Sequence, residues 1–129
     1  MTPAEANLYI GRPWVAGARG PAAFDCWGLL KWVERLHFGV ALPELPALPD
    51  ERRDLYGEQM ATGVWRLIPA PVHGCGALLR GGEQPHVGVY LAHDGGGVLH
   101  AQEGTGVIFT PGRNLKLMGY PRVCWYSFD

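Results

Sequence analysis

Apolar and polar positions follow a helical period between Asp25 and Gly39. Leu29, Leu30, Val33, Leu36 and His37 keep the helical period on one side, and charged residues occupy the other side. Asp25 is well suited to cap a helix N-terminus, and Gly39 is well suited to end a helix. The pattern therefore predicts a helix that begins at Cys26. The segment Thr2–Glu5 forms a capping box, which predicts a second, shorter helix through about Tyr9.

The pattern changes in the second half of the chain, where short runs rich in valine and leucine alternate with glycine and proline. Each run is predicted to form a β-strand. We expect an extended, proline-rich connector over 42–49 and a short helix over 50–61 before the first strand. Helices followed by strands predict an α+β fold with a mostly antiparallel sheet. The predicted strands are Val64–Ile68, Ala77–Arg80, His86–Leu91, Val98–Gln102, Val107–Thr110 and Val123–Phe128.

The composition predicts one globular domain over residues 1–129. Of these residues 47% are hydrophobic, and 19 glycines and 11 prolines indicate many turns. Eleven basic and twelve acidic residues give a net charge of −1, which argues against binding nucleic acid through its phosphates. No apolar run is long enough to predict a membrane span. The first residues do not have the pattern of a secretory signal, so we expect synthesis in the cytoplasm.

The three cysteines, Cys26, Cys75 and Cys124, are widely spaced. Their odd number and spacing predict neither a disulfide framework nor a zinc site, and we expect no metal and no cofactor. Cys26 directly follows the predicted cap Asp25. Backbone N–H groups and the positive end of the helix dipole favour a thiolate at this position, and the thiolate is the nucleophilic form. The alternative is that Cys26 is a small buried core residue, as we expect for Cys75 and Cys124.

Two histidines lie on predicted strands. A cysteine nucleophile needs a base that stabilises the thiolate and later protonates the leaving amine. His86 begins a strand on which it shares one face with Gly88 and Tyr90. His100, on the next strand, is the candidate to orient the imidazole of His86. Taken singly, each histidine is better explained as a structural residue than as a catalytic one.

The spacing of the two histidines sets a condition on the turn between their strands. In a regular hairpin, His86 and His100 lie opposite each other only if the turn is centred on His93. The glycines after Asp94 favour a later centre, and a turn centred on Gly95 would separate the histidines by roughly 13 Å, at about 3.3 Å per residue. We therefore predict a turn centred near His93, or a glycine bulge that restores the register.

Together these residues resemble the NlpC/P60 cysteine peptidases. The resemblance covers about residues 11–107, and it implies a papain-like fold in which the helix with the catalytic cysteine packs on the sheet. It implies Cys26 as nucleophile, His86 as base and His100 as the orienting residue. It also implies peptidoglycan stem peptides as substrates, commonly cleaved between γ-D-glutamate and a diamino acid. The matching segments are Phe24-Asp25-Cys26-Trp27-Gly28-Leu29, His86-Val87-Gly88-Val89-Tyr90-Leu91, and Val98-Leu99-His100-Ala101 followed by Gly106-Val107.

The chain departs from the family pattern at two positions. It has Trp27 where the family usually has serine after the cysteine, and Trp14 where the family usually has tyrosine in the preceding loop. The usual serine and tyrosine help to bind substrate and stabilise the oxyanion, so the resemblance implies an altered specificity. Asp25 and Trp27, which flank Cys26 in the sequence, and Trp14 in the preceding loop are candidate substrate-binding residues.

An aromatic residue after the cysteine, in a short chain without wall-binding repeats, resembles the members encoded with phage tails and related gene-transfer particles. We therefore expect tail hub or tip proteins as partners, a tail tip as the location, and action in the periplasm or cell wall. Two alternatives stay open. One is a structural tail component whose peptidase site has decayed, and the other is a related papain-like amidase in which Glu103 takes the third role.

Overall fold

The computed structural model describes residues 1–43, 65–81 and 86–128. The expected helix over 50–61 and most of the expected connector over 42–49 lie outside these residues. The described part contains two α-helices, two short 3₁₀ helices and six strands. They are α1 (Pro3–Asn7), α2 (Cys26–Phe38), β1 (Arg66–Ile68), β2 (Gly76–Arg80), β3 (His86–Leu91), η1 (His93–Gly95), β4 (Gly97–Gln102), β5 (Gly106–Pro111), η2 (Gly112–Asn114) and β6 (Arg122–Ser127).

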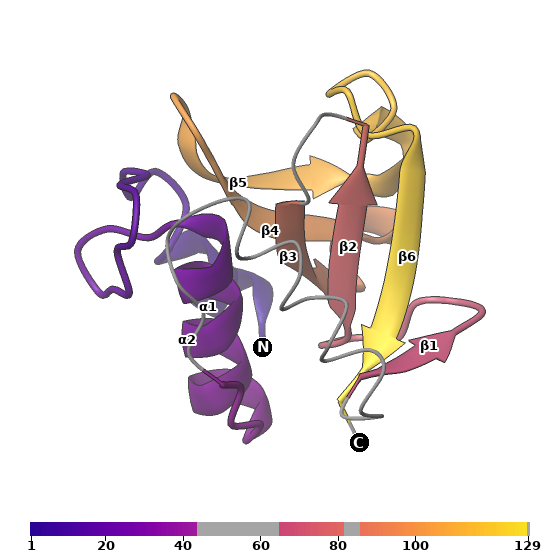
Figure 1. The fold of residues 1–129 in the computed structure, drawn as a ribbon, viewed down its shortest axis with the longest axis horizontal. Coiled ribbons are helices and arrows are strands. Elements are labelled where there is room, and N and C mark those ends of the chain that lie inside the picture. The colour runs from indigo at the N-terminus through magenta and orange to yellow at the C-terminus, as the bar shows by residue number, and fades with distance from the viewer. Residues whose placement is uncertain (44–64, 82–85, 129) are drawn as a thin grey trace.

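The six strands form one sheet in the order β1-β6-β2-β3-β4-β5, and each neighbouring pair is antiparallel. Figure 1 shows α2 standing beside the sheet, with β4 and β5 running across the direction of β2 and β6. Helix α2 packs mainly against β3, and less extensively against β4. The predicted α+β fold with an antiparallel sheet is confirmed.

The predicted bounds of α2 are also confirmed, and its two ends show why. At the N-terminus the Asp25 side chain accepts a hydrogen bond from the N–H of Gly28, which satisfies one of the helix's unpaired donors. At the C-terminus Gly39 adopts a left-handed conformation with φ 70°, which glycine adopts without the strain of a side chain. The helix therefore begins at Cys26 because the residue before it is a cap.

Two clusters of apolar side chains cover the two faces of the sheet. On one face, Val87, Val89 and Leu91 of β3 pack with the buried side of α2. The opposite face is covered by a smaller cluster of Ala77, Leu79, Val98 and Leu115. Side chains alternate along a strand, so His86 points to the face opposite Val87. His86 therefore lies on the face that carries the smaller cluster. Because that cluster is small, the face has room for polar side chains.

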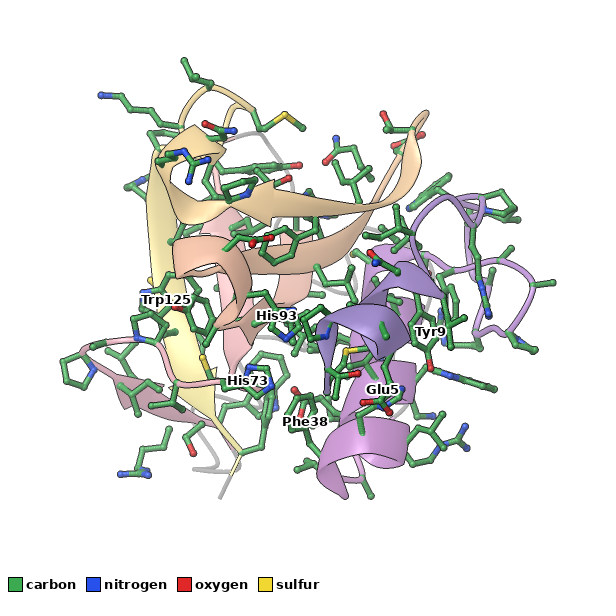
Figure 2. The ribbon with its side chains drawn as sticks, turned by 180° about the vertical axis from the view of Figure 1, so that it is seen from behind. Glu5, Tyr9, Phe38, His73, His93 and Trp125 are labelled. Carbon is green, nitrogen blue, oxygen red and sulfur yellow. The ribbon has the colours of Figure 1, made fainter. Side chains whose placement is uncertain are left out.

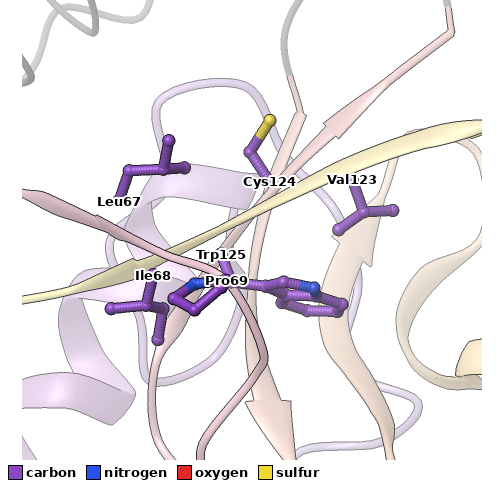
Figure 3. A pocket seen from close by; sticks show the side chains of 6 residues that line it. All are labelled: Leu67, Ile68, Pro69, Val123, Cys124 and Trp125. Atoms are coloured by element: carbon purple, nitrogen blue, oxygen red, sulfur yellow. The ribbon is translucent and has the colours of Figure 1, made fainter.

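A cavity of about 390 Å³ opens between β1 and β6 (Figure 3). Its lining is mostly apolar and includes the thiol of Cys124, with none of the candidate catalytic residues. The residues that line the cavity are Leu67, Ile68, Pro69, Val123, Cys124 and Trp125.

No helix among the described residues is long and apolar enough to cross a membrane.

Candidate active site

Cys26 is the first residue of α2, and 5% of its surface is exposed. The capping carboxylate of Asp25 holds the backbone around it. Asp25 Oδ1 accepts hydrogen bonds from the N–H of Gly28 at 2.7 Å and from Arg19 Nη1 at 2.9 Å, and Oδ2 accepts one from the N–H of Gly17 at 3.1 Å. The loop before the helix and the first helical turn are therefore fixed to one buried carboxylate, which positions Cys26.

Gly28 is necessary for this arrangement because the preceding loop passes directly over the first turn of α2. A β-carbon at position 28 would overlap the carbonyl oxygen of Ala18. That same carbonyl accepts a hydrogen bond from the N–H of Asp25 at 3.0 Å. The Asp-Cys-x-Gly segment thus combines a cap, a candidate nucleophile and the space that the loop needs.

His86 and His100 are in direct contact. His86 Nε2 lies 2.7 Å from His100 Nδ1, and the ring centroids are 4.9 Å apart at an interplanar angle of 76°. The distance is well within the range of a strong hydrogen bond. The predicted contact between the two histidines is present in the structure.

The register that produces this contact is not the predicted one. Leu91 pairs with Gly97 and Val89 pairs with Leu99, so the turn is centred on Asp94, one residue after the predicted centre. Asp94 adopts a left-handed conformation with φ 51°, which aspartate tolerates better than most residues. Continuing the register places His100 opposite Gly88, and His86 reaches His100 along the diagonal. Diagonal neighbours across an antiparallel pair are within reach of long or aromatic side chains.

A third residue extends the pair. His100 Nε2 lies 2.9 Å from the hydroxyl oxygen of Thr110, which is on β5. His100 is fully buried, and burial lowers its pKa to about 4, so the ring is neutral at neutral pH. A neutral imidazole has one N–H and one acceptor nitrogen, and the Thr110 hydroxyl can serve as acceptor or donor. Thr110 was not among the predicted site residues, because a threonine on a strand carries no distinctive signal.

Tyr120 also belongs to the site and was not predicted. Its ring lies parallel to that of His86, with centroids 5.4 Å apart and planes 11° apart. Its hydroxyl donates a hydrogen bond of 2.7 Å to Gln102 Oε1. Burial raises the pKa of Tyr120, the hydrogen bond to Gln102 opposes the rise, and charge on Cys26 adds to it. Tyr120 is therefore next to His86 and close enough to Cys26 for its charge to matter.

The three candidate substrate-binding residues have different environments. Trp27 is fully buried, stacks on Trp65 with centroids 5.5 Å apart, and donates a hydrogen bond to the carbonyl of Pro43. The indole of Trp27 belongs to the core, which argues against the expected contact of Trp27 with substrate. The carboxylate of Asp25 is buried and holds the helix cap. Trp14 is partly exposed and packs against the same core, and its contact with substrate stays a prediction.

The other described histidines have structural partners on a different part of the molecule. His73 and His93 lie side by side near Phe38 (Figure 2), with centroids 5.4 Å apart, and each lies within hydrogen-bond distance of the Met1 carbonyl. His37 bonds to the hydroxyl of Tyr9 at 2.8 Å. Among the described residues, no group of three or more histidine, cysteine or acidic side chains is arranged to hold a metal ion.

Two comparisons place the chain among known proteins. The model of the NlpC/P60 family matches residues 11–115. The chain is similar to the crystal structure of the NlpC/p60 domain of the peptidoglycan hydrolase SagA, with 23% sequence identity and a TM-score of 0.59, over 95% of this chain and 92% of that chain. At this identity the likeness shows the fold. No curated protein matches the chain.

Proposed function

The chain belongs to the NlpC/P60 family, and on that premise we propose that it is a cysteine peptidase that hydrolyses the stem peptides of peptidoglycan. One observation carries the proposal: His86, His100 and Thr110 form a hydrogen-bonded series across three strands. A buried histidine that bonds to a second histidine on one side and to a hydroxyl on the other orients the outer imidazole. Such a series supports acid–base chemistry next to a nucleophile.

The proposed reaction uses Cys26 and His86 in two steps. The Cys26 thiolate attacks the scissile carbonyl carbon, the C–N bond breaks, and His86 gives its proton to the leaving amine. A thioester to Cys26 remains. Water then attacks this thioester while His86 takes one proton from the water. The C–S bond breaks to release the carboxylic acid, which leaves Cys26 as the thiolate and His86 protonated. The net change is the addition of one water molecule across the peptide bond.

His100 and Thr110 determine which nitrogen of His86 carries the proton. When His86 is protonated, its Nε2–H donates to the unprotonated Nδ1 of the neutral His100, whose Nε2–H then donates to the Thr110 hydroxyl. This arrangement leaves Nδ1 of His86 as the nitrogen available to exchange a proton with the thiol, the leaving amine or water. Burial keeps His100 neutral, so the pair does not accumulate two positive charges.

Stem peptides as the substrate class are supported by the family and by one solved structure of similar fold. That structure is described as a domain of a peptidoglycan hydrolase. The family resemblance favours the bond between γ-D-glutamate and a diamino acid. Trp27 occupies the core where the family usually has serine, so the position after Cys26 supplies no hydroxyl. We therefore propose the stem peptide as substrate and Trp14 as a side chain that contacts it.

The test is digestion of purified peptidoglycan followed by mass analysis of the muropeptides. We expect the wild-type protein to release cleaved stem peptides and Cys26→Ala to release none. His86→Ala should lower the rate of cleavage about 10²–10⁴-fold, the usual contribution of general acid–base catalysis. His100→Ala should keep a larger residual rate. Cys124→Ala and His93→Ala are matched controls. Full activity of Cys26→Ala would contradict the mechanism, and an inactive, folded wild-type protein would favour a structural tail component.

We propose further that a phage tail or a related particle delivers the enzyme to the wall, with tail hub or tip proteins as its partners. The support comes from the sequence, in which an aromatic residue follows the nucleophile. Mass spectrometry of purified particles from a strain that encodes the chain would test the proposal. We expect peptides of this protein in intact particles, and their absence from particles that contain the other tail proteins would contradict it.

A further inference from the structure

We propose that Tyr120 is a positioning residue that holds the imidazole of His86 in the orientation its acid–base role requires. The inference rests on the proposed function, because it assigns Tyr120 to the reaction of Cys26 and His86. Tyr120 lies beyond residues 11–115, the segment that matches the family. The contacts of its ring and its hydroxyl carry the argument.

The ring of Tyr120 touches both histidines of the pair. It lies parallel to His86, with an interplanar angle of 11°, and meets His100 at 87° with centroids 6.1 Å apart. A parallel aromatic neighbour limits rotation of the imidazole about its bond to the β-carbon, because rotation would force the rings into each other. The angle between the two histidine rings, and so the direction of the 2.7 Å hydrogen bond between them, is thereby restrained.

Tyr120 is itself held firmly. Its hydroxyl donates to Gln102 Oε1 at 2.7 Å, and its backbone N–H donates to the carbonyl of Leu115 at 3.0 Å. Leu115 is 4% exposed and packs in the small cluster on this face of the sheet. Gln102 lies two residues after His100 on β4, so one strand supplies both the orienting histidine and the anchor of the tyrosine. The position of the ring is thus tied to the strand that carries the pair.

The placement has two chemical consequences. An aromatic face against an imidazole becomes more favourable when the imidazole is protonated, because the ring face attracts a cation. The half-buried ring also limits access of water to the bond between the histidines, which strengthens a hydrogen bond in a less polar surrounding. Both effects favour the state in which Cys26 is a thiolate and His86 is protonated. Loss of the ring should therefore slow the chemical step without weakening substrate binding.

The experiment compares Tyr120→Leu, which removes the aromatic face, with Tyr120→Phe, which keeps it and loses the bond to Gln102. Tyr90→Leu is the matched control, because Tyr90 lies on β3 and packs edge-on against Trp125 rather than against a catalytic histidine. Turnover and KM on soluble stem peptide are measured separately, together with the rate at which iodoacetamide modifies Cys26 at pH 7. The NMR chemical shifts of the His86 imidazole protons report the stacking directly, because the ring current of Tyr120 moves them upfield.

We expect Tyr120→Leu to lower kcat about tenfold with KM unchanged, to slow modification of Cys26, and to move the His86 proton signals downfield. Tyr120→Phe should lower kcat about threefold and keep the upfield signals, and Tyr90→Leu should match wild type. A raised KM with unchanged kcat would overturn the assignment in favour of a substrate contact. Equal losses in Tyr120→Leu and Tyr90→Leu would overturn it in favour of general packing.

Two outcomes separate this inference from the proposed function. If the folded wild-type protein cleaves no stem peptide but Tyr120→Leu still slows modification of Cys26, the proposed function fails and the assignment of Tyr120 stands. If the wild type cleaves and Tyr120→Leu equals it in kcat and in modification rate, the assignment of Tyr120 fails and the proposed function stands.

Should Tyr120→Leu not fold, Gln102→Leu removes the anchor and leaves the ring. We expect it to lower kcat about threefold, and an unchanged kcat would overturn the assignment.

Discussion

His86 and His100 share a 2.7 Å hydrogen bond although they do not lie opposite each other in the sheet. Gly88 occupies the position opposite His100, and a β-carbon there would lie 3.0 Å from the β-carbon of His100 and 2.8 Å from the carbonyl of Leu99. The diagonal contact therefore depends on a residue without a side chain. The His-Val-Gly segment supplies both the base and the space beside its partner.

Gly88→Ala should impair the histidine pair without removing either histidine. The added methyl group also meets Val98 Cγ1 at 2.5 Å, so β3 and β4 have to separate locally. We expect a loss of about 1–3 kcal/mol in the free energy of unfolding, as for other overpacked sites, and a lower kcat. Urea denaturation and turnover measure the two effects. Gly95→Ala is a control, because a β-carbon at that position meets nothing within 4 Å, although its positive φ carries some strain. Wild-type turnover by a folded Gly88→Ala protein would contradict the explanation.

Thr110→Val should weaken the reaction more than Thr110→Ser. Valine has nearly the shape of threonine but leaves the buried Nε2 of His100 without its partner 2.9 Å away, which costs about 1–3 kcal/mol. Serine restores the hydroxyl. We expect kcat to fall about tenfold in Thr110→Val and to recover substantially in Thr110→Ser. Equal activities of the two variants would show that the hydroxyl does not take part.

Cys26 should react with iodoacetamide faster than Cys75 and Cys124 near neutral pH. Cys26 lies at the N-terminus of α2, and the proposed mechanism pairs it with His86. Both favour the thiolate, whose fraction controls the rate of alkylation. Burial raises the pKa of the Cys75 thiol, so Cys75 should react slowest. Peptide mapping after brief labelling distinguishes the three. Labelling confined to Cys124, which is partly exposed, would contradict an activated thiol at position 26.

Glu34 should make the protein less stable as the pH rises. It is 1% exposed on α2, neither carboxyl oxygen has a hydrogen-bond partner in the part of the chain that the structure describes, and burial raises its pKa to about 8. The folded protein therefore keeps a proton on Glu34 between about pH 4.5 and 8, whereas the unfolded chain has lost it. The free energy of unfolding then falls across this window, by up to about 1.4 kcal/mol per pH unit.

Urea denaturation at pH 6.5, 7.2 and 8 checks this prediction. Buried His100 contributes the opposite slope between about pH 4 and 6.5, because its pKa in the folded protein is about 4, so the higher range isolates Glu34. Glu34→Gln should remove most of the decrease, while Glu103→Gln, at an exposed position, should keep it. An identical slope in the wild type and in Glu34→Gln would refute the assignment.

Local chemistry made most of the elements predictable. Asp25 and Gly39 mark the two ends of α2 because capping and left-handed backbone are properties of single residues. The alternation of valine and leucine with small or polar residues located β3 and β4, because successive side chains of a strand point to opposite faces. The centre of the turn between them was one residue away from the prediction, because Asp94 takes a left-handed conformation, which glycine adopts more readily.

The surroundings of the candidate site were less predictable. Trp27 is next to the nucleophile in the sequence, yet its position on α2 turns its indole into the core against Trp65. Thr110 and Tyr120 reach His100 and His86 from β5 and from the segment before β6. Nothing in their spacing indicates such contacts, because these contacts depend on strand order and on the path of a loop. A family pattern finds the reacting groups more readily than the residues that hold them.

The division of the site between helix and sheet has a consequence for when chemistry can begin. Cys26 comes from α2, near the start of the chain, and its candidate partner His86 comes from β3, about 60 residues later. Contacts between distant segments form late in folding, since the intervening chain has to be ordered first. A nascent or partly folded copy would thus carry a thiol of ordinary reactivity at Cys26. The moment at which fast alkylation of Cys26 first appears during folding would report when α2 packs on the sheet.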